Sequence, residues 1–125
     1  MKKILAIDDS EVNLLLIKSI FEEEADINVV LENNSELVIS EIRKNPYDLI
    51  LLDLMMPVVD GFDILKTIQD DPSLVKIPVI VLSAKKDKQS IIKAFEYGVV
   101  DYVQKPLDLT ILKETVISRL SFKMT

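Results

Sequence analysis

The sequence predicts an α/β fold in which helices cover both faces of an open, doubly wound parallel sheet. Short apolar runs alternate with longer amphipathic segments five times along the chain, which is the pattern of repeated strand–helix units. The runs 3–7, 49–53 and 77–83 are almost continuously apolar, as strands are when both of their faces are buried. With 125 residues, of which 49% are hydrophobic, the chain can bury one core, so residues 1–125 are expected to form a single domain.

The expected strands are short segments that are rich in apolar and β-branched residues. In chain order they are KILAI (3–7), INVVL (27–31), LILLD (49–53), IPVIVLS (77–83) and DYVQ (101–104). A helix is expected between consecutive strands, because parallel neighbours are joined by right-handed crossover connections.

The expected helices are longer segments with apolar residues at helical spacing. Their ranges are 11–23, 35–44, 62–69, 88–97 and 109–120. Ser35 is expected to cap the second helix, and Asp60-Gly61 to form a turn before the third. Pro72 and Pro78 bracket the approach to the fourth strand. No linker, low-complexity tract or long repeat interrupts this pattern, so a second domain is not expected.

The composition excludes several classes of chemistry. The absence of cysteine removes disulfides and thiol nucleophiles, and the absence of histidine removes imidazole bases and ligands. A net charge of −6 opposes attraction to phosphate backbones, so no direct nucleic-acid partner is expected. No apolar run approaches the roughly 18 residues that a membrane-spanning helix needs, and the start of the chain lacks a signal-peptide pattern. A cytoplasmic location without a membrane partner is therefore expected.

Three aspartates stand at the ends of two expected strands. Asp8 and Asp9 follow the first strand, and Asp53 closes the third. If the first strand lies between the second and the third, these carboxyl ends flank the crevice where open α/β sheets bind ligands. Converging carboxylates repel one another, and Mg²⁺ with its oxygen ligands is the natural neutraliser. A cation also explains why an apolar run ends on an acid, since an isolated buried carboxylate is costly.

Ser83 and Lys105 extend this pattern along the same edge of the sheet. Ser83 ends the fourth strand, and Lys105 follows the fifth, immediately before Pro106. A metal, a hydroxyl and an ammonium around one carboxylate are suited to bind a phosphoryl group. Taken singly, each group has an ordinary structural explanation as a turn residue, a loop hydroxyl or a surface charge. Together they favour Asp53 as a nucleophile of the class that forms aspartyl phosphate.

At these positions the chain resembles the receiver domain of two-component response regulators, over essentially its whole length. The matching segments are DDS (8–10), DLMMPVVDG (53–61), LSA (82–84) and DYVQKP (101–106), in the family's order and spacing. The resemblance implies a flavodoxin-like (βα)5 fold with a five-stranded parallel sheet in the order 2-1-3-4-5. It also implies a phosphorylation-activated signalling switch, such as those of phosphorelays.

The resemblance assigns a role to each of the three aspartates, Asp8, Asp9 and Asp53, which we call the acidic cluster, and to Met55. Asp53 would be the phosphoacceptor and, like Asp9, a direct Mg²⁺ ligand. Asp8 would reach the metal through water, and Met55 would contribute its backbone carbonyl. A receiver of this kind is not a classical enzyme, but it catalyses its own phosphorylation and dephosphorylation.

The resemblance also covers the later motifs. Lys105 would pair with one phosphoryl oxygen, and Ser83 would donate a hydrogen bond to another. Lys105-Pro106 matches the family's cis peptide, which X-Pro bonds permit at a low free-energy cost. Tyr102 corresponds to an aromatic switch residue that moves inward when the hydroxyl at Ser83 is drawn to the phosphoryl group. An ordinary strand tyrosine is the alternative for Tyr102.

The expected phosphodonor is a phosphohistidine on a sensor histidine kinase or a histidine phosphotransfer protein. The first helix begins beside Asp9 and carries more apolar residues than one buried stripe needs. A core face needs only Leu16, Ile17, Ile20 and Phe21. Leu14 or Leu15 would then be exposed and could dock the donor, unless the buried face is wider.

The expected output surface comprises the helices 88–97 and 109–120 and the strand 101–104, which the family uses for effector contacts or homodimers. Core positions are expected at Ile91, Ala94, Phe95, Leu112, Val116 and Leu120, which leaves Ile92, Val100 and Ile117 for the surface. Many DNA-binding members carry an aromatic residue where this chain has Leu107. Output by direct promoter binding is therefore not expected. The sequence is expected to be a stand-alone receiver or one excised from a longer protein.

Two alternatives to the signalling switch remain open at this point. A haloacid-dehalogenase-like phosphatase also uses a strand-end aspartate, Mg²⁺ and lysine, but it needs a second acid at the position of Met55. A receiver-like interaction module that never carries phosphate would leave the acids, Ser83 and Lys105 unexplained. In a receiver, the side chains of Met55 and Lys85 would lie beside the path of attacking water and tune hydrolysis.

Overall fold

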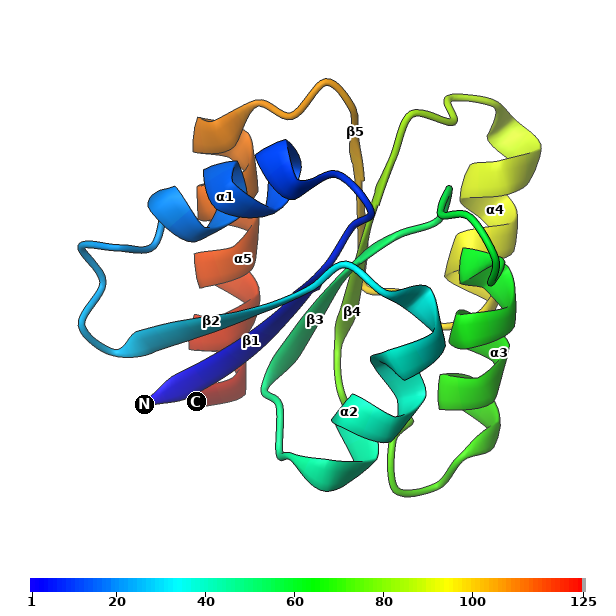
Figure 1. The fold of residues 1–125 in the computed structure, drawn as a ribbon, viewed down its shortest axis with the longest axis horizontal. Coiled ribbons are helices and arrows are strands. Elements are labelled where there is room, and N and C mark those ends of the chain that lie inside the picture. The colour runs from blue at the N-terminus through cyan, green and yellow to red at the C-terminus, as the bar shows by residue number, and fades with distance from the viewer. Residues whose placement is uncertain (125) are drawn as a thin grey trace.

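A computed structural model describes residues 1–124 of the chain, and the surroundings of side chains through residue 120. Within residues 1–124 five parallel strands form one sheet in the order β2-β1-β3-β4-β5 (Figure 1). The strands are β1 (Lys2–Ile7), β2 (Ile27–Glu32), β3 (Leu49–Asp53), β4 (Val79–Ser83) and β5 (Asp101–Gln104). The predicted fold class and strand order are confirmed.

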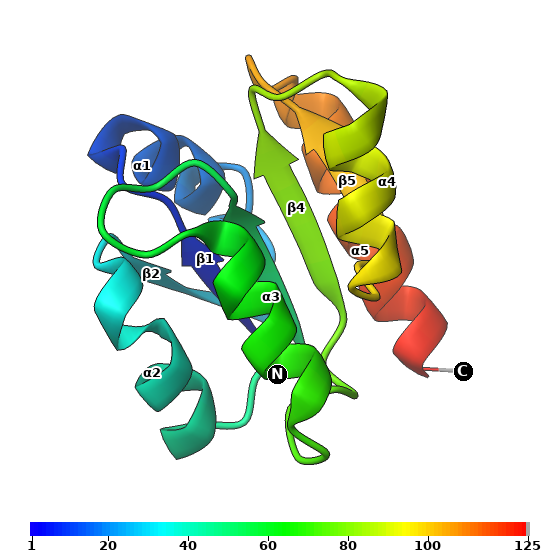
Figure 2. The same ribbon diagram turned by 90° about the vertical axis from the view of Figure 1, so that its right-hand side faces the viewer.

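The helices follow the strands one by one and cover both faces of the sheet (Figure 1 and Figure 2). They are α1 (Glu11–Ser19), α2 (Val38–Lys44), α3 (Gly61–Asp70), α4 (Lys88–Glu96) and α5 (Leu109–Met124), with a short 3₁₀ helix, η1 (Ser35–Leu37), before α2. Helices α1 and α5 pack on one face, whereas α2, α3 and α4 pack on the other.

Two buried clusters, one on each face of the sheet, form the core. Successive residues of a strand contribute to opposite clusters, as the pleat requires: Ile50 packs with α2 and α3, and its neighbour Leu51 packs with α1 and α5. All residues of β3 and β4 are buried. This double burial explains why these strands read as continuous apolar runs, and it fixes their carboxyl ends on a rigid sheet.

The ends of two predicted helices differ from the structure. Helix α1 ends at Ser19 rather than near residue 23, because tight turns follow in which the amide of Phe21 donates to the carbonyl of Lys18. These turns bury Phe21, and the acidic run after it is unfavourable at a helix C-terminus. The predicted cap at Ser35 is also wrong. Asn34 caps η1 with its side chain, and the Ser35 hydroxyl instead donates to the carbonyl of Pro57.

Two residues predicted for the core lie at the surface. Leu16 is 39% exposed, because the buried face of α1 runs through Leu14 and Ile17. Phe95 is 46% exposed, since α4 faces the core with Ala94, and the next residue is rotated about 100° around the helix. The other predicted core residues of α5, namely Leu112, Val116 and Leu120, are buried as expected.

Candidate functional site

The three aspartates predicted for the site come together at the carboxyl edge of the sheet. Strand β1 pairs with β3 so that Ile7 lies opposite Leu52, and the residues that follow, Asp8 and Asp53, therefore end side by side. Carboxylate oxygens of Asp8, Asp9 and Asp53 lie within 4.8 Å of one another. Asp8 and Asp53 are buried, whereas Asp9 is exposed and opens the cluster to solvent.

Lys105 links the two buried acids. Its ammonium donates to Oδ2 of Asp8 at 2.8 Å and to Oδ2 of Asp53 at 3.1 Å. The residue stands just after β5, and its peptide bond to Pro106 is cis, as predicted. Within the described residues, every buried side-chain nitrogen and oxygen has a hydrogen-bond partner. The buried acids therefore have their hydrogen bonds satisfied within the protein fold, and the single ammonium of Lys105 offsets only part of their negative charge.

Two partners of Asp8 did not emerge from the sequence pattern. The amide of Ser10 donates to Oδ1 of Asp8 at 2.9 Å, and the side-chain amide of Asn13 donates to Oδ2 at 3.3 Å. Ser10 is also the N-cap of α1 and accepts from the amide of Asn13. The signal in the sequence is a cap residue and a polar first-turn residue directly after an aspartate pair.

The protein environment shifts the pKa values of the two buried acids, Asp8 and Asp53, in opposite directions. Burial raises the pKa of Asp53 to about 6, although hydrogen bonds from Met55 and Lys105 act in the opposite direction. Burial also favours a higher pKa for Asp8, but the hydrogen bonds from Lys105 and Ser10 outweigh it and lower the pKa. The pKa of Lys105 is raised, because its two carboxylate partners outweigh its burial. Asp53 is thus the more basic carboxylate of the pair, which favours it as the nucleophile.

The donor set suits a hard divalent cation. It consists of oxygen atoms from three carboxylates. One of these acids, Asp9, is exposed to solvent, so a hydrated ion can reach the cluster from that side. The amide of Met55 donates to Oδ1 of Asp53 at 3.0 Å, which holds the backbone of Met55 against the cluster. These residues therefore fit Mg²⁺, and the role of the Met55 carbonyl stays a prediction.

Ser83 and Tyr102 lie near the same edge. Ser83 is buried, and its hydroxyl accepts from the amide of Lys85 at 3.1 Å. The hydroxyl of Tyr102, which is half-buried, donates to the carbonyl of Lys85 at 2.9 Å. Both side chains thus form a hydrogen bond with the backbone of Lys85. A shift of the segment after β4 would therefore change both hydrogen bonds. The switch role of Tyr102 remains a prediction.

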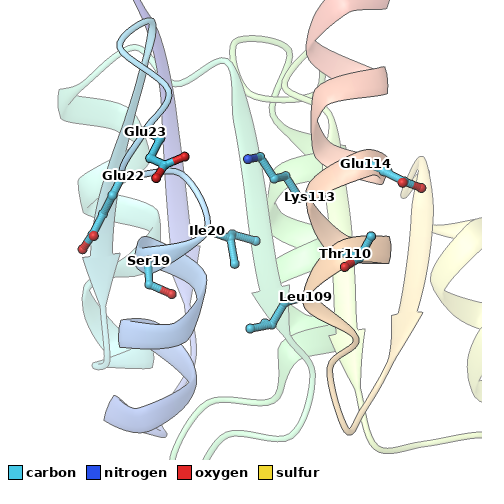
Figure 3. A pocket seen from close by; sticks show the side chains of 8 residues that line it. All are labelled: Ser19, Ile20, Glu22, Glu23, Leu109, Thr110, Lys113 and Glu114. Atoms are coloured by element: carbon cyan, nitrogen blue, oxygen red, sulfur yellow. The ribbon is translucent and has the colours of Figure 1, made fainter.

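A shallow groove of 440 Å³ between the end of α1 and the start of α5 is separate from this site (Figure 3). Ile20 and Leu109 form its apolar part, and Lys113 at its edge pairs with Glu24 at 3.2 Å. None of the residues that line it belongs to the acidic cluster. The ligand crevice at the sheet edge stays a prediction, and this groove is not part of it.

Comparison with known proteins agrees with this geometry. The family model for the response regulator receiver domain matches residues 4–117. The response regulator PleD of Caulobacter vibrioides is 33% identical over 123 residues, which cover 98% of this chain and 27% of PleD. The chemotaxis protein CheY-3 of Vibrio cholerae is 30% identical over 112 residues, which cover 90% of this chain and 86% of CheY-3.

Solved structures show the same fold. A two-component response regulator from Clostridium difficile superposes with a TM-score of 0.88 at 34% identity, covering 97% of each chain. The receiver domain of the Francisella response regulator 1452 superposes with a TM-score of 0.89 at 30% identity, covering 98% of this chain and 99% of that one. The chain spans about a quarter of the length of PleD and of a probable cyclic di-GMP phosphodiesterase from Vibrio cholerae that it matches. It belongs to the response regulator receiver domain family, whose domains act as phosphorylation-activated signalling switches.

Proposed function

We propose that this receiver accepts a phosphoryl group on Asp53. The observation that supports this most strongly is the position of the Lys105 ammonium, 3.1 Å from Asp53 and 2.8 Å from Asp8, at a sheet edge that Asp9 opens to solvent. Asp8, Asp9, Asp53 and the backbone carbonyl of Met55 would hold Mg²⁺. The family match and the absence of an acid at Met55 do not favour a haloacid-dehalogenase-like phosphatase.

The proposed transfer is an in-line displacement. A carboxylate oxygen of Asp53 attacks phosphorus, and the bond between phosphorus and the donor imidazole nitrogen breaks, so that the imidazole leaves with the electron pair. Lys105 pairs with one phosphoryl oxygen, and the Ser83 hydroxyl donates to another. When bound, Mg²⁺ supplies positive charge that offsets the carboxylates and the phosphoryl oxygens. Attack of water on phosphorus later breaks the bond between phosphorus and the Asp53 oxygen, which releases inorganic phosphate and restores the Asp53 carboxylate.

Labelling by a small acyl phosphate tests this proposal. Wild-type protein incubated with acetyl phosphate and Mg²⁺ is expected to gain one phosphoryl group, which mass spectrometry maps to the peptide that contains Asp53. Chelation by EDTA should lower the labelling at least about tenfold, because the converging carboxylates would then repel the incoming phosphoryl oxygens. Labelling at an exposed acid such as Asp60, or labelling that EDTA leaves unchanged, would contradict the proposal.

The proposed phosphodonor is a phosphohistidine on a sensor histidine kinase or a phosphotransfer protein, and α1 is its proposed docking surface. The structure changes which leucines of α1 are available for docking. Leu14 is buried, whereas Leu15 is 63% exposed and Leu16 lies beside it at the surface. Helix α1 begins two residues after Asp9, so a donor that packs on these leucines is held close to Asp53.

Substitution of Leu15 separates docking from chemistry. Leu15→Lys is expected to slow transfer from the protein donor about tenfold, which corresponds to roughly 1.4 kcal/mol of lost docking free energy. Labelling by acetyl phosphate should not change, because Leu15 is not one of the residues of the acidic cluster. Val75→Lys, at an exposed valine after α3, is the matched control. An equal loss with both donors would refute the docking role.

Output is proposed to run through the α4-β5-α5 face, toward an effector protein or a second copy. Ile92 is exposed there, and Phe95 adds an apolar side chain that the sequence pattern had placed in the core. Val100 and Ile117 pack partly against the core and contribute less free surface. Sedimentation and partner capture with and without BeF₃⁻ measure this output, and assembly that is identical in both conditions would exclude the face.

Met55 and Lys85 are proposed to tune the lifetime of the phosphoryl group. The side chain of Met55 is 52% exposed, and both residues line one pocket beside the end of β3. Their side chains can therefore restrict the approach of water to phosphorus. Timing phosphate loss in variants of each residue measures this tuning, and lifetimes equal to that of the wild type would end the proposal.

A further inference from the structure

The loop between β3 and α3 contains a backbone conformation that its sequence does not favour. Val58 has a φ angle of 75°, in the left-handed region that β-branched residues rarely adopt. The amide of Val59 donates to the carbonyl of Pro57 at 2.9 Å and closes a three-residue turn around Val58. With a positive φ angle such a turn is the rarer, strained form. The Val58 side chain is 82% exposed, so its own packing does not hold it in this conformation.

A buried hydroxyl from another segment contacts this turn. Ser35, the first residue of η1, is buried, and its hydroxyl donates to the carbonyl of Pro57 at 3.0 Å. That carbonyl therefore accepts two hydrogen bonds, one from Val59 within the turn and one from Ser35. Figure 2 shows the segment before α2 beside the loop that leads into α3. A strained backbone conformation persists only where its surroundings enforce it, and Ser35 supplies such a contact.

Both ends of the loop are fixed close to Asp53. At its start, the amide of Met55 donates to Asp53. At its end, the amide of Gly61 donates to the carbonyl of Leu54 at 3.2 Å, and a Cβ atom on Gly61 would lie 2.5 Å from the Cα atom of Leu54. Relaxation of the tip around Val58 would therefore release the backbone strain of the loop. This tip lies three residues from Met55.

We propose that Ser35 is a positioning residue for the cation site. By holding the carbonyl of Pro57, it keeps the strained turn at Val58 closed and so fixes the backbone of Met55. This inference rests on the proposed function, because the Met55 carbonyl is one of the groups proposed to hold Mg²⁺. The need for the Ser35 hydroxyl arises from the strain at Val58, so a glycine there, which adopts positive φ freely, removes that need.

A double-mutant cycle tests this coupling. Mg²⁺ dissociation constants are measured by NMR titration for wild type, Ser35→Ala, Val58→Gly and the double variant. Ser35→Ala is expected to weaken Mg²⁺ binding about three- to tenfold in the wild-type background and less than about twofold in the Val58→Gly background. In metal-free protein, Ser35→Ala should speed hydrogen exchange of the Val59 amide about tenfold, and Ser35→Thr, which keeps the hydroxyl, should restore slow exchange.

Ser40→Ala is the matched control. It removes a hydroxyl-to-carbonyl bond of the same 3.0 Å length, from Ser40 to Leu37, that does not involve the loop. This change should alter neither Mg²⁺ binding nor exchange at Val59. If Ser35→Ala does not fold, Val58→Gly alone still tests the strain on which the inference rests, because release of strain should raise the Tm by a few degrees without weakening Mg²⁺ binding.

Three outcomes would overturn the inference. The first is equal weakening of Mg²⁺ binding by Ser35→Ala in both backgrounds, because Ser35 would then not act through the strain at Val58. The second is a Ser35→Ala variant with a lower Tm and an unchanged dissociation constant, which describes a bond that only stabilises the fold. The third is a Val58→Gly variant whose Tm does not rise. Absence of Mg²⁺ binding by the wild type would instead remove the proposed function, and this inference with it.

Discussion

Replacing Asp53 by asparagine is expected to abolish phosphoryl labelling and, in metal-free buffer at pH 7, to make the fold more stable. Labelling should fall at least about 100-fold, because an amide oxygen is a far weaker nucleophile than a carboxylate. The stability change follows from burial, which raises the pKa of Asp53 from 3.8 to about 6. At pH 7 the ionised carboxylate therefore destabilises the native state, and its removal should gain about 1 to 3 kcal/mol.

The sign of this effect depends on pH. Between pH 3.8 and about 6 the native state binds a proton at Asp53 more tightly than the unfolded state does, so this group's contribution to stability falls as pH rises through that window. The gain from Asp53→Asn should accordingly be largest near pH 7 and shrink toward pH 4. Urea unfolding across this range measures it, with Asp26→Asn, at an exposed acid, as the control. A gain that does not vary with pH would contradict the burial argument.

Replacing Lys105 by methionine is expected to have the opposite effect on stability, because it should destabilise the fold. The substitution keeps most of the side-chain volume but leaves the buried carboxylates of Asp8 and Asp53 without their shared ammonium. Removing one partner of a buried ion pair costs several kcal/mol, and we expect a loss of about 2 to 4 kcal/mol because the Lys105 side chain is 17% exposed. Labelling by acetyl phosphate should also fall, since a phosphoryl oxygen loses its cationic partner.

Added Mg²⁺ should recover much of the stability lost in Lys105→Met, because the cation supplies positive charge to the same carboxylates. Lys113→Met is the matched control. Its ammonium pairs with Glu24 at 3.2 Å, but both side chains are more than a third exposed, so its removal should cost less than about 1 kcal/mol. Equal losses in the two variants, or a loss in Lys105→Met that Mg²⁺ leaves unchanged, would show that Lys105 does not balance this cluster.

The site was largely predictable because its residues mark strand ends. In a parallel sheet all carboxyl ends lie on one edge, so Asp8, Asp53 and Ser83 were expected to converge once the apolar runs identified the strands and the family resemblance supplied their order. The sequence contains no cysteine or histidine, which excluded thiol and imidazole chemistry. The aspartates at the strand ends then indicated a site with oxygen ligands for a metal ion. The cis bond between Lys105 and Pro106 followed from the family motif.

By itself the sequence determined the fold class, the strand order through its family resemblance, and the chemistry at the sheet edge. Only the tertiary structure decided which leucines of α1 are buried, that Phe95 faces solvent, and that Ser35 contacts Pro57 across 22 residues of chain. The physical reason is the range of the interactions. Strand burial and turn chemistry are encoded in neighbouring residues, whereas the rotation of a helix on the sheet and a hydroxyl's choice of partner depend on packing between segments distant in sequence.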